Sequence, residues 1–363
     1  MADLTTRLHD LVNERVSLET KLQREPGELS DEAAEQYDRQ YAQLQRQIGV
    51  LFREAAPDQT DDQQRITMML ELMRILENRL VYLHNFTVNA TADNRQLAQL
   101  VAQFIDSLTA QHSSVLTSLE ATYYRAVAAL YAGDAAHARD YFTAACESEE
   151  SDEANDIKYK SFVILGHLSH EEHDYARAKD LHDQSMRYTQ APNVTAQALA
   201  LKALNAYALQ DYDDALHLFE EALALFDPNQ PFFNSYFFRN ALLFCGAIYF
   251  DRRDYARAAA RYRTVLENVD RNSYDHFDAL SHLGRIAYAQ GQWDEAAETL
   301  EKAVQMHRLN ENEYVVDTWF WIARSHIKRN DPAQARGYLE KIAASEVHYE
   351  KKPQAVEMLR KVS

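Results

Sequence analysis

The chain has 363 residues, of which 38 are basic and 56 acidic, and its formal net charge at pH 7 is −18. It contains only 8 glycines, whereas average usage of about 7% would give about 25, so glycine-rich folds are disfavoured and an all-α fold is expected. The negative charge argues against binding to nucleic acid, which requires clustered Lys and Arg, and against binding to anionic membrane surfaces.

Residues 1–113 are expected to form an N-terminal helical bundle. Four apolar stripes with helical spacing run over Leu4–Leu22, Tyr37–Leu51, Ile66–Leu83 and Leu97–Leu108. The first three predict a bundle of long helices, and the fourth leads into the rest of the chain. Such long helices, with 11 basic and 18 acidic side chains in residues 1–115, do not fit a helix-turn-helix DNA reader.

Residues 114–363 contain an internal repeat. Six alanines occupy one equivalent position, at intervals of 40, 37, 43, 38 and 39 residues: Ala138, Ala178, Ala215, Ala258, Ala296 and Ala335. In four repeats an aromatic residue stands three positions earlier, namely Tyr175, Tyr212, Tyr255 and Trp293. Only a small side chain fits where two helix axes approach to about 8 Å, so each alanine predicts a close helix contact.

The clearest unit combines Leu283-Gly284 with Gly291-Gln292-Trp293, Ala296, Leu300 and Ala303. This pattern resembles the tetratricopeptide repeat, and the resemblance spans roughly residues 116–347. It implies about six antiparallel helix pairs wound into a right-handed superhelix, and the tail after residue 351 is expected to add a capping helix. Because the intervals exceed the usual 34 residues, either the second helices or the loops that follow them are longer here.

The whole layout, a long-helix bundle followed by extended repeats, resembles the Rap-type peptide-sensing regulators of Gram-positive bacteria within the RRNPP superfamily. The resemblance implies that the repeats bind a short signal peptide. It also implies that the bundle contacts a response regulator, as a phosphatase, or a transcription factor, as an inhibitor. Rap-type phosphatases use a bundle glutamine, and Gln43, Gln45 and Gln47 lie on the second predicted helix. Since glutamine is common on solvated helix faces, no catalytic residue is assigned.

The candidate binding residues lie on the inner wall of the predicted superhelix, which the first helix of each pair forms. The predicted peptide-binding residues are Tyr207, Asn240, Asp278, Ser281, Arg285, Tyr288, Asp317, Phe320, Arg324 and Lys328. Among them Arg285, Arg324 and Lys328 form a basic cluster that could hold a carboxylate. The alternative is that these cations pair with the two aspartates of the same wall. Further inner-wall positions upstream are Tyr123, Tyr131, His167 and His170.

Other reactive residues do not combine into a recognisable catalytic or metal site. The histidines His167, His170 and His173 are three residues apart, whereas a zinc-binding His-Glu-x-x-His helix needs histidines four apart. No cofactor or metal is therefore expected. Cys245 stands at a helix-contact position and is expected in the core. The aromatic run at residues 232–238 is expected to pack an inter-repeat loop, with a ligand-facing wall as the alternative.

The sequence predicts a cytoplasmic protein. No stretch of about 20 apolar residues occurs, the N-terminal residues have no apolar signal core, and the two cysteines do not form a CxxC pair. The predicted function is non-catalytic binding of a peptide or protein segment by the repeats, with the bundle contacting a response regulator or transcription factor. The alternatives are a Rap-like phosphatase acting on a phospho-aspartyl response regulator and a plain assembly scaffold. A homo-oligomer is compatible with the sequence.

Overall fold

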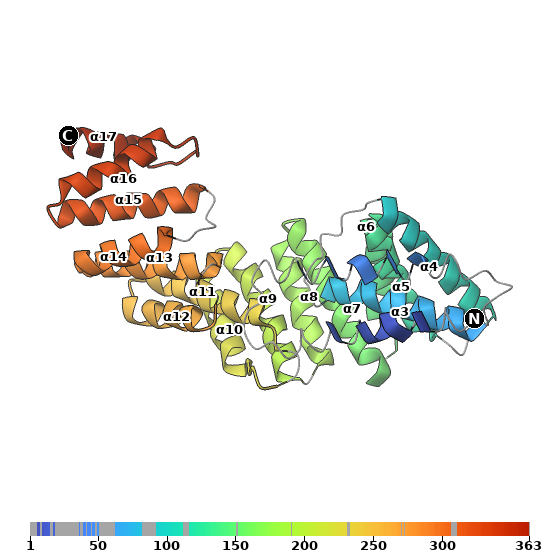
Figure 1. The fold of residues 1–363 in the computed structure, drawn as a ribbon. Helices are drawn as coiled ribbons and strands as arrows, with labels where there is room; N and C mark the ends of the chain where they lie inside the picture. The colour runs from blue at the N-terminus through green and yellow to red at the C-terminus, as the bar shows by residue number, and fades with distance from the viewer. Residues whose placement is uncertain are drawn as a thin grey trace. The chain divides into compact units, whose positions relative to one another are not determined.

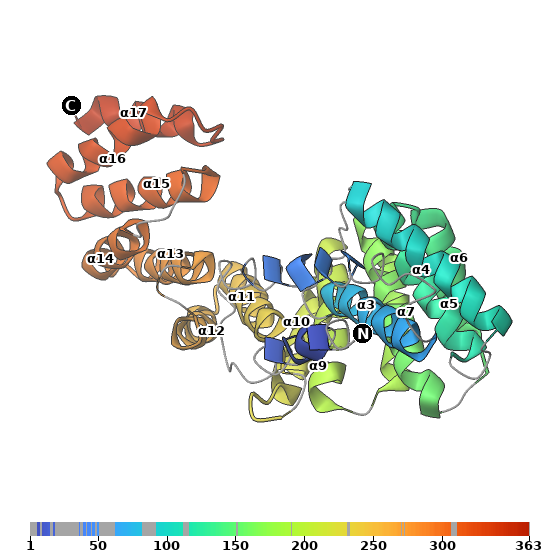
Figure 2. The same cartoon turned by 45° about the vertical axis from the view of Figure 1, so that its right-hand side comes forward.

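The computed structural model describes residues 62–81, 92–111, 116–149, 152–189, 191–230, 233–269, 271, 273–305 and 311–362, together with isolated residues between positions 6 and 50. All regular structure in these ranges is helical, which confirms the all-α prediction (Figures 1 and 2). Within the same ranges no helix is long and apolar enough to cross a membrane. Contacts between residues divide the chain into two compact units, residues 1–234 and 235–363.

The first unit contains α3 to α10. Its helices are α3 (Asp62–Val81), α4 (Ala92–Gln111), α5 (Ser118–Ala132), α6 (Ala135–Cys146), α7 (Asp152–Glu171), α8 (Tyr175–Ser185), the 3-10 helix η1 (Met186–Tyr188), α9 (Pro192–Ala208) and α10 (Tyr212–Leu225). Helix α4 covers the fourth predicted stripe, and α3 covers the third as far as Leu80. The first and second predicted helices are described only in part, as short helical stretches between residues 6 and 50. The boundary of the bundle at residue 113 stays a prediction.

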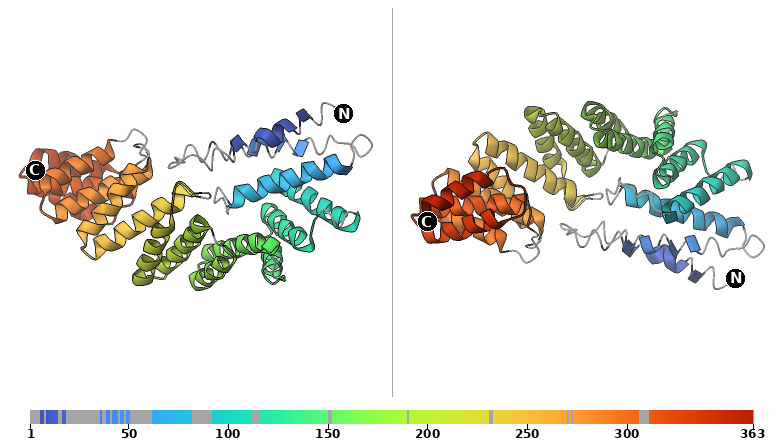
Figure 3. Two further views of the ribbon diagram at one scale, coloured as in Figure 1. Left: turned by 90° about the horizontal axis from the view of Figure 1, so that it is seen from below. Right: turned by 90° about the horizontal axis from the view of Figure 1, so that it is seen from above.

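Helix α3 lies against α5 and α7, the first helices of the first two pairs (Figure 3). The Tyr131 hydroxyl of α5 donates a hydrogen bond of 2.9 Å to the carbonyl oxygen of Leu76. The Nζ atom of Lys160, on α7, lies 2.5 Å from a carboxylate oxygen of Glu77. Met73 of α3 is buried in the same core cluster as Tyr131. Part of the wall that α5 and α7 form is therefore covered by the chain itself.

The second unit contains α11 to α17. Its helices are α11 (Ser235–Asp251), α12 (Tyr255–Glu267), α13 (Tyr274–Ala289), α14 (Trp293–Val304), α15 (Glu313–Lys328), α16 (Pro332–Ala344) and α17 (Lys352–Val362). Helices α11 to α16 form three successive antiparallel pairs, and α17 packs on α16. The last helix confirms that the tail after residue 351 is helical.

Each helix pair turns through one residue in the left-handed conformation. These residues are Gly133, His173, Gln210, Arg253, Gly291 and Asn330, with φ between 60° and 80°. The amide of the next residue donates to a carbonyl five residues back, as from Asp134 to Ala129. In five pairs that next residue is an aspartate whose carboxylate caps the second helix, and only Gln292 makes no side-chain cap. The capping aspartate thus fixes the start of the second helix, and four of the six turns carry a residue other than glycine in the left-handed conformation.

The six predicted contact alanines are completely buried: Ala138, Ala178, Ala215, Ala258, Ala296 and Ala335 are each 0% exposed. A second close contact joins the first helix to the residue 16 positions later on the second helix. A Cβ atom on Gly166 would lie 2.5 Å from the ring of His182, and one on Gly246 would lie 2.7 Å from the ring of Tyr262. These glycines are required because a large buried side chain presses on the backbone.

The unusual repeat length comes from the linkers and the first helices. The second helices of the pairs have only 11 to 14 residues, whereas the first helices have 15 to 20. The linker after α10 runs from residue 226 to residue 234, and the linker after α14 runs from residue 305 to residue 312. Of the two predicted alternatives, longer second helices are therefore not what the described residues show.

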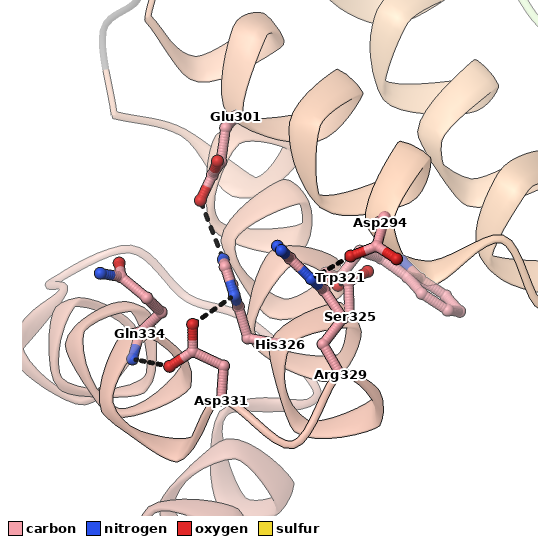
Figure 4. A network of polar contacts seen from close by, with 8 residues as sticks. All are labelled: Asp294, Glu301, Trp321, Ser325, His326, Arg329, Asp331 and Gln334. Carbon is pink, nitrogen blue, oxygen red and sulfur yellow. Dashed lines mark hydrogen bonds and ion pairs between the residues drawn. The ribbon is translucent and has the colours of Figure 1, made fainter.

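A buried histidine joins the last two repeats (Figure 4). His326 of α15 is 3% exposed, and its Nε2 atom lies 2.9 Å from a carboxylate oxygen of Glu301, on α14. Its Nδ1 atom lies 3.6 Å from the carboxylate of Asp331, the capping residue of α16. The ring stacks on Tyr338, with centroids 6.2 Å apart. One side chain of α15 thus contacts residues of both α14 and α16.

Candidate functional site

Two arginines of the second unit lie over aromatic rings on the face formed by α11, α13 and α15. The guanidinium of Arg285, on α13, lies 5.0 Å from the ring centroid of Phe250 and 5.4 Å from that of Trp321. The guanidinium of Arg324, on α15, lies 4.6 Å from the Trp321 centroid and 4.9 Å from that of Tyr288. Cations and rings therefore alternate across three helices, an arrangement stabilised by cation–π attraction.

The aromatic members of this cluster also contact one another. Tyr288 and Trp321 pack edge to face, with centroids 5.2 Å apart. The indole Nε1 of Trp321 donates a hydrogen bond of 3.0 Å to Asp317, one turn earlier on α15. Since the indole is held at its edge and its faces, its position is defined before any ligand arrives. We call Phe250, Arg285, Tyr288, Trp321 and Arg324 the arginine–aromatic cluster.

Asp317 is neutralised by the segment after α16. The Tyr349 hydroxyl and Lys351 Nζ each donate to Asp317 Oδ1 at 2.7 Å. Burial opposes ionisation of Asp317, but these hydrogen bonds and the Lys351 charge hold its pKa below the ordinary value. Burial and the neighbouring carboxylate raise the pKa of Tyr349, so its hydroxyl keeps the donated proton. Asp317 is thus an ionised carboxylate that already has a cationic partner.

The alternative in which the wall aspartates pair with the arginines is not what the geometry shows. The Asp278 carboxylate lies 3.2 Å from His282 Nδ1, and Asp317 pairs with Lys351. Among the described residues neither Arg285 nor Arg324 has a carboxylate within ion-pair distance. Arg285 still acts on Asp317 at longer range, since its charge contributes to the lowered pKa. Both guanidinium charges remain available to an anion.

The other predicted site residues fall into different environments. Ser281 is 7% exposed and shares a hydrogen bond of 3.0 Å with Thr318, while Phe320 is 1% exposed in the core of α15 and α16. These two side chains are buried, which removes them from the surface that a ligand could touch. Lys328 is exposed beside Trp293, at 5.9 Å from the ring centroid, and Asn240 is half-buried on α11.

The inner-wall positions upstream belong to the first unit. Tyr207 packs edge to face on Tyr212, at 5.2 Å. Tyr123 and Tyr131 are each 2% exposed beneath α3. His170 Nδ1 lies 2.8 Å from the side-chain oxygen of Asn205. In the described part of the chain no group of three potential ligands is placed to hold a metal ion.

Four residues of the site were missing from the sequence prediction: Phe250, Trp321, Tyr349 and Lys351. Trp321 stands four residues after Asp317, a spacing that places both on one helix face and could have indicated their contact. The last two lie in the linker after α16, outside the repeat frame, so no periodic signal marks them.

The regular helix pairs, the buried alanines and the repeated turns have a counterpart in known families. Residues 201–243 and 246–311 match one tetratricopeptide-repeat model, and residues 317–345 match a second. These residues carry tetratricopeptide repeats. The matches cover the later repeats, and the first two helix pairs show the same turn and the same buried alanine.

Several solved structures match parts of the chain at low sequence identity. The apo form of the quorum sensor NprR from B. thuringiensis is 16% identical over 83% of this chain and 81% of that chain, with a TM-score of 0.51. YrrB, described as a tetratricopeptide-repeat protein with an unusual peptide-binding site, is 15% identical over 60% of this chain and 92% of that chain, with a TM-score of 0.42. BtubC from P. vanneervenii is 17% identical over 62% of this chain and 90% of that chain, with a TM-score of 0.48. No curated protein has a significant match to the chain.

Proposed function

We propose that this protein is a regulator whose tetratricopeptide repeats bind a peptide or protein segment at the arginine–aromatic cluster. The observation that carries the proposal is the state of Arg285 and Arg324. Both lie over aromatic rings, and neither has a carboxylate partner among the described residues, although the chain has 56 acidic side chains. A segment with a free C-terminal carboxylate or an acidic side chain would form hydrogen-bonded ion pairs with these two guanidinium groups.

The aromatic rings add to this function by orienting the arginines. A guanidinium that lies over a ring keeps its N–H groups directed outward in its own plane, which suits bidentate binding of a carboxylate. Because Trp321 lies beside both Arg285 and Arg324, the two cations are held near each other at little further entropic cost. Tyr288 and Asn240, both half-exposed, are available to the rest of a bound peptide.

The finer proposal is a peptide-responsive regulator whose N-terminal part contacts a second protein. The fold shared with NprR, a quorum sensor by its own description, supports this version. The competing proposals are a Rap-like phosphatase and a plain scaffold. In the phosphatase version a bundle glutamine would act, and Gln43 and Gln47 both have exposed side chains, while Gln45 lies outside the described residues.

The first experiment measures peptide binding by fluorescence polarisation, with labelled random peptides that end in either a free carboxylate or an amide. The wild type is expected to prefer the free-carboxylate pool, and Arg324→Ala or Arg285→Ala to weaken binding about tenfold, equivalent to about 1.4 kcal/mol. The matched control is Arg336→Ala, which removes an exposed arginine of α16 paired with Glu340. Equal binding of both pools, or equal loss in the control, contradicts the proposal.

A second experiment separates the regulator from the phosphatase. Phosphate release from a phosphorylated response regulator is measured with the wild-type chain and with Gln43→Ala and Gln47→Ala. The regulator proposal expects no release above the spontaneous rate. Release that either substitution abolishes would favour the phosphatase instead.

A further inference from the structure

A groove on another side of the second unit offers a binding surface that the arginine–aromatic cluster does not use. It has a volume of about 420 Å³ and lies between α12 and α14, with α13 as its floor. The floor residues Leu280 and Leu283 stand two residues from Asp278 and Arg285. Two residues along a helix rotate the side chain by about 200°, so α13 presents the groove and the cluster on opposite faces.

The floor of the groove carries an apolar stripe about two helical turns long. Leu280, Leu283 and Ala287 of α13 follow an i, i+3, i+7 stripe along the floor. On α12, Ala259 and Leu266 continue the apolar surface in one wall. The three leucines are half-exposed. A helix laid along this groove would bury them by fitting its own ridge of side chains against the floor stripe.

The basic and acidic residues of the groove lie at opposite ends, with the basic residues at the Leu280 end. Leu280 and Val304, the last residue of α14, pack against the same buried cluster, so Lys302 lies toward the Leu280 end. Arg263 and Leu266, near the C-terminal end of α12, precede the short linker into α13 and lie at this same end. Arg263 and Lys302 have exposed side chains, and neither has an ion pair among the described residues. This end therefore combines half-exposed leucines with two available cations.

The opposite end is polar and weakly acidic. Gln290 ends the first helix of the pair, Gln292 precedes the second, and Glu295 follows within its first turn. A binding partner thus meets amide groups and one carboxylate at one end, and two cations at the other. In a chain with a net charge of −18, a local pair of cations beside apolar surface indicates an acidic, amphipathic partner.

We infer that this groove binds an amphipathic helix of a partner protein, with apolar side chains on Leu280, Leu283 and Ala287 and carboxylates between Arg263 and Lys302. The site is separate from the arginine–aromatic cluster, so the two surfaces can be occupied independently. The protein would then bridge two partners, one on each face of α13.

The test uses a fluorescein-labelled peptide three helical turns long, with leucines along one face and a pair of aspartates at one end. Its control replaces the aspartates with lysines. The aspartate peptide is expected to bind the wild-type chain and to lose about tenfold in affinity in Arg263→Glu/Lys302→Glu, equivalent to about 1.4 kcal/mol. Ala256→Trp, which fills the groove from an exposed lining position, should weaken binding to a similar extent.

Arg336→Ala is the matched control, because it removes an exposed cation of α16 that lines neither the groove nor the arginine–aromatic cluster and should leave this binding unchanged. Melting curves of all variants verify that they fold. Binding of the aspartate peptide that survives both groove variants would overturn the inference, as would equal binding of the lysine peptide. A wild-type dimer that Ala256→Trp converts to a monomer would also overturn it, since a second copy would then be the occupant.

Discussion

Lys160 of α7 and Glu77 of α3 form an ion pair of 2.5 Å, with side chains only 17% and 10% exposed. Lys160 also lies 2.5 Å from Asp156, and the Tyr123 hydroxyl donates to Glu77 at 3.5 Å. Burial alone would lower the pKa of Lys160, but the two carboxylates raise it above the ordinary value, so the ammonium stays charged. The pair ties a helix of the N-terminal part to the wall of the first repeats.

We predict that the two partners of this pair differ in their importance. Lys160→Met leaves the Glu77 carboxylate buried with one weak donor and should lower the free energy of unfolding by about 3 kcal/mol. Glu77→Gln leaves Lys160 paired with Asp156 and should cost about half as much. Urea denaturation followed by circular dichroism measures both. Lys361→Met, at an exposed pair on α17, should cause no measurable change, and a larger loss in Glu77→Gln than in Lys160→Met would refute the prediction.

Periodic features of the fold could be predicted from the sequence because the same residue type recurs at the same helix contact in each repeat. The alanine of each pair is one example, since Ala258 of α12 and Ala296 of α14 occupy equivalent positions in two pairs and are both fully buried. The all-α fold and the helical tail follow from the same pattern. The capping aspartates also stand in the sequence four residues before five of the six alanines, as Asp254 does before Ala258. The residue before the aspartate varies, since Arg253 adopts the left-handed conformation in its pair whereas Gly133 does so in another.

Contacts outside the repeat frame could not be predicted from spacing. Glu77 and Lys160 are 83 residues apart, and Lys351 reaches Asp317 from a linker that has no periodic neighbour. The sequence therefore identified Arg285 and Arg324 as cations of the first-helix wall. It left open whether the aspartates would neutralise them, because that depends on where the linker after α16 lies.

Replacing two glycines of the second unit with alanine should change the free energy of unfolding in opposite directions. A Cβ atom on Gly246 would lie 2.7 Å from the Tyr262 ring, so Gly246→Ala should lower stability by about 1–3 kcal/mol through overpacking. A Cβ atom on Gly337, inside α16, meets nothing within 4 Å, so Gly337→Ala should raise stability by up to about 1 kcal/mol. Urea denaturation of both variants provides the measurement. Shifts of the same sign would show that contact with Tyr262 does not decide the residue at this position.

The network around His326 predicts a contrast between a buried and an exposed contact (Figure 4). His326→Leu keeps the side-chain volume but removes the contact with Glu301, and should cost about 1–3 kcal/mol. Arg329→Ala removes the neighbouring pair with Asp294, whose side chains are 33% and 84% exposed, and should cost at most about 1 kcal/mol. Native-state hydrogen exchange of the α15 and α16 amides measures the loss. Equal losses would mean that burial of His326 adds nothing to the joint between these repeats.

Acid sensitivity should arise at His182, the buried side chain that presses on Gly166. Burial, with a smaller contribution from His167 and His170, lowers the pKa of His182 to about 3, and burial lowers that of His167 to about 4. In the unfolded chain both histidines bind a proton below about pH 6.5. The unfolded state therefore binds more protons between about pH 6.5 and pH 3. Stability should be complete above this window and should fall with pH by up to about 1.4 kcal/mol per unit for each histidine.

The repeats supply the variants that test this assignment, because Tyr262 faces Gly246 as His182 faces Gly166. His182→Tyr should reduce the slope of the unfolding free energy against pH between pH 4 and 6 by about 1.4 kcal/mol per pH unit, which corresponds to one proton. The contribution of His167 should remain. The converse variant, Tyr262→His, should increase the slope by a similar amount, since it places a second imidazole in an equivalent buried position. Urea titrations at a series of pH values measure both slopes. If His182→Tyr leaves the slope unchanged, the acid sensitivity comes from another group, because the lost imidazole would then have carried no difference in proton binding between the folded and unfolded states.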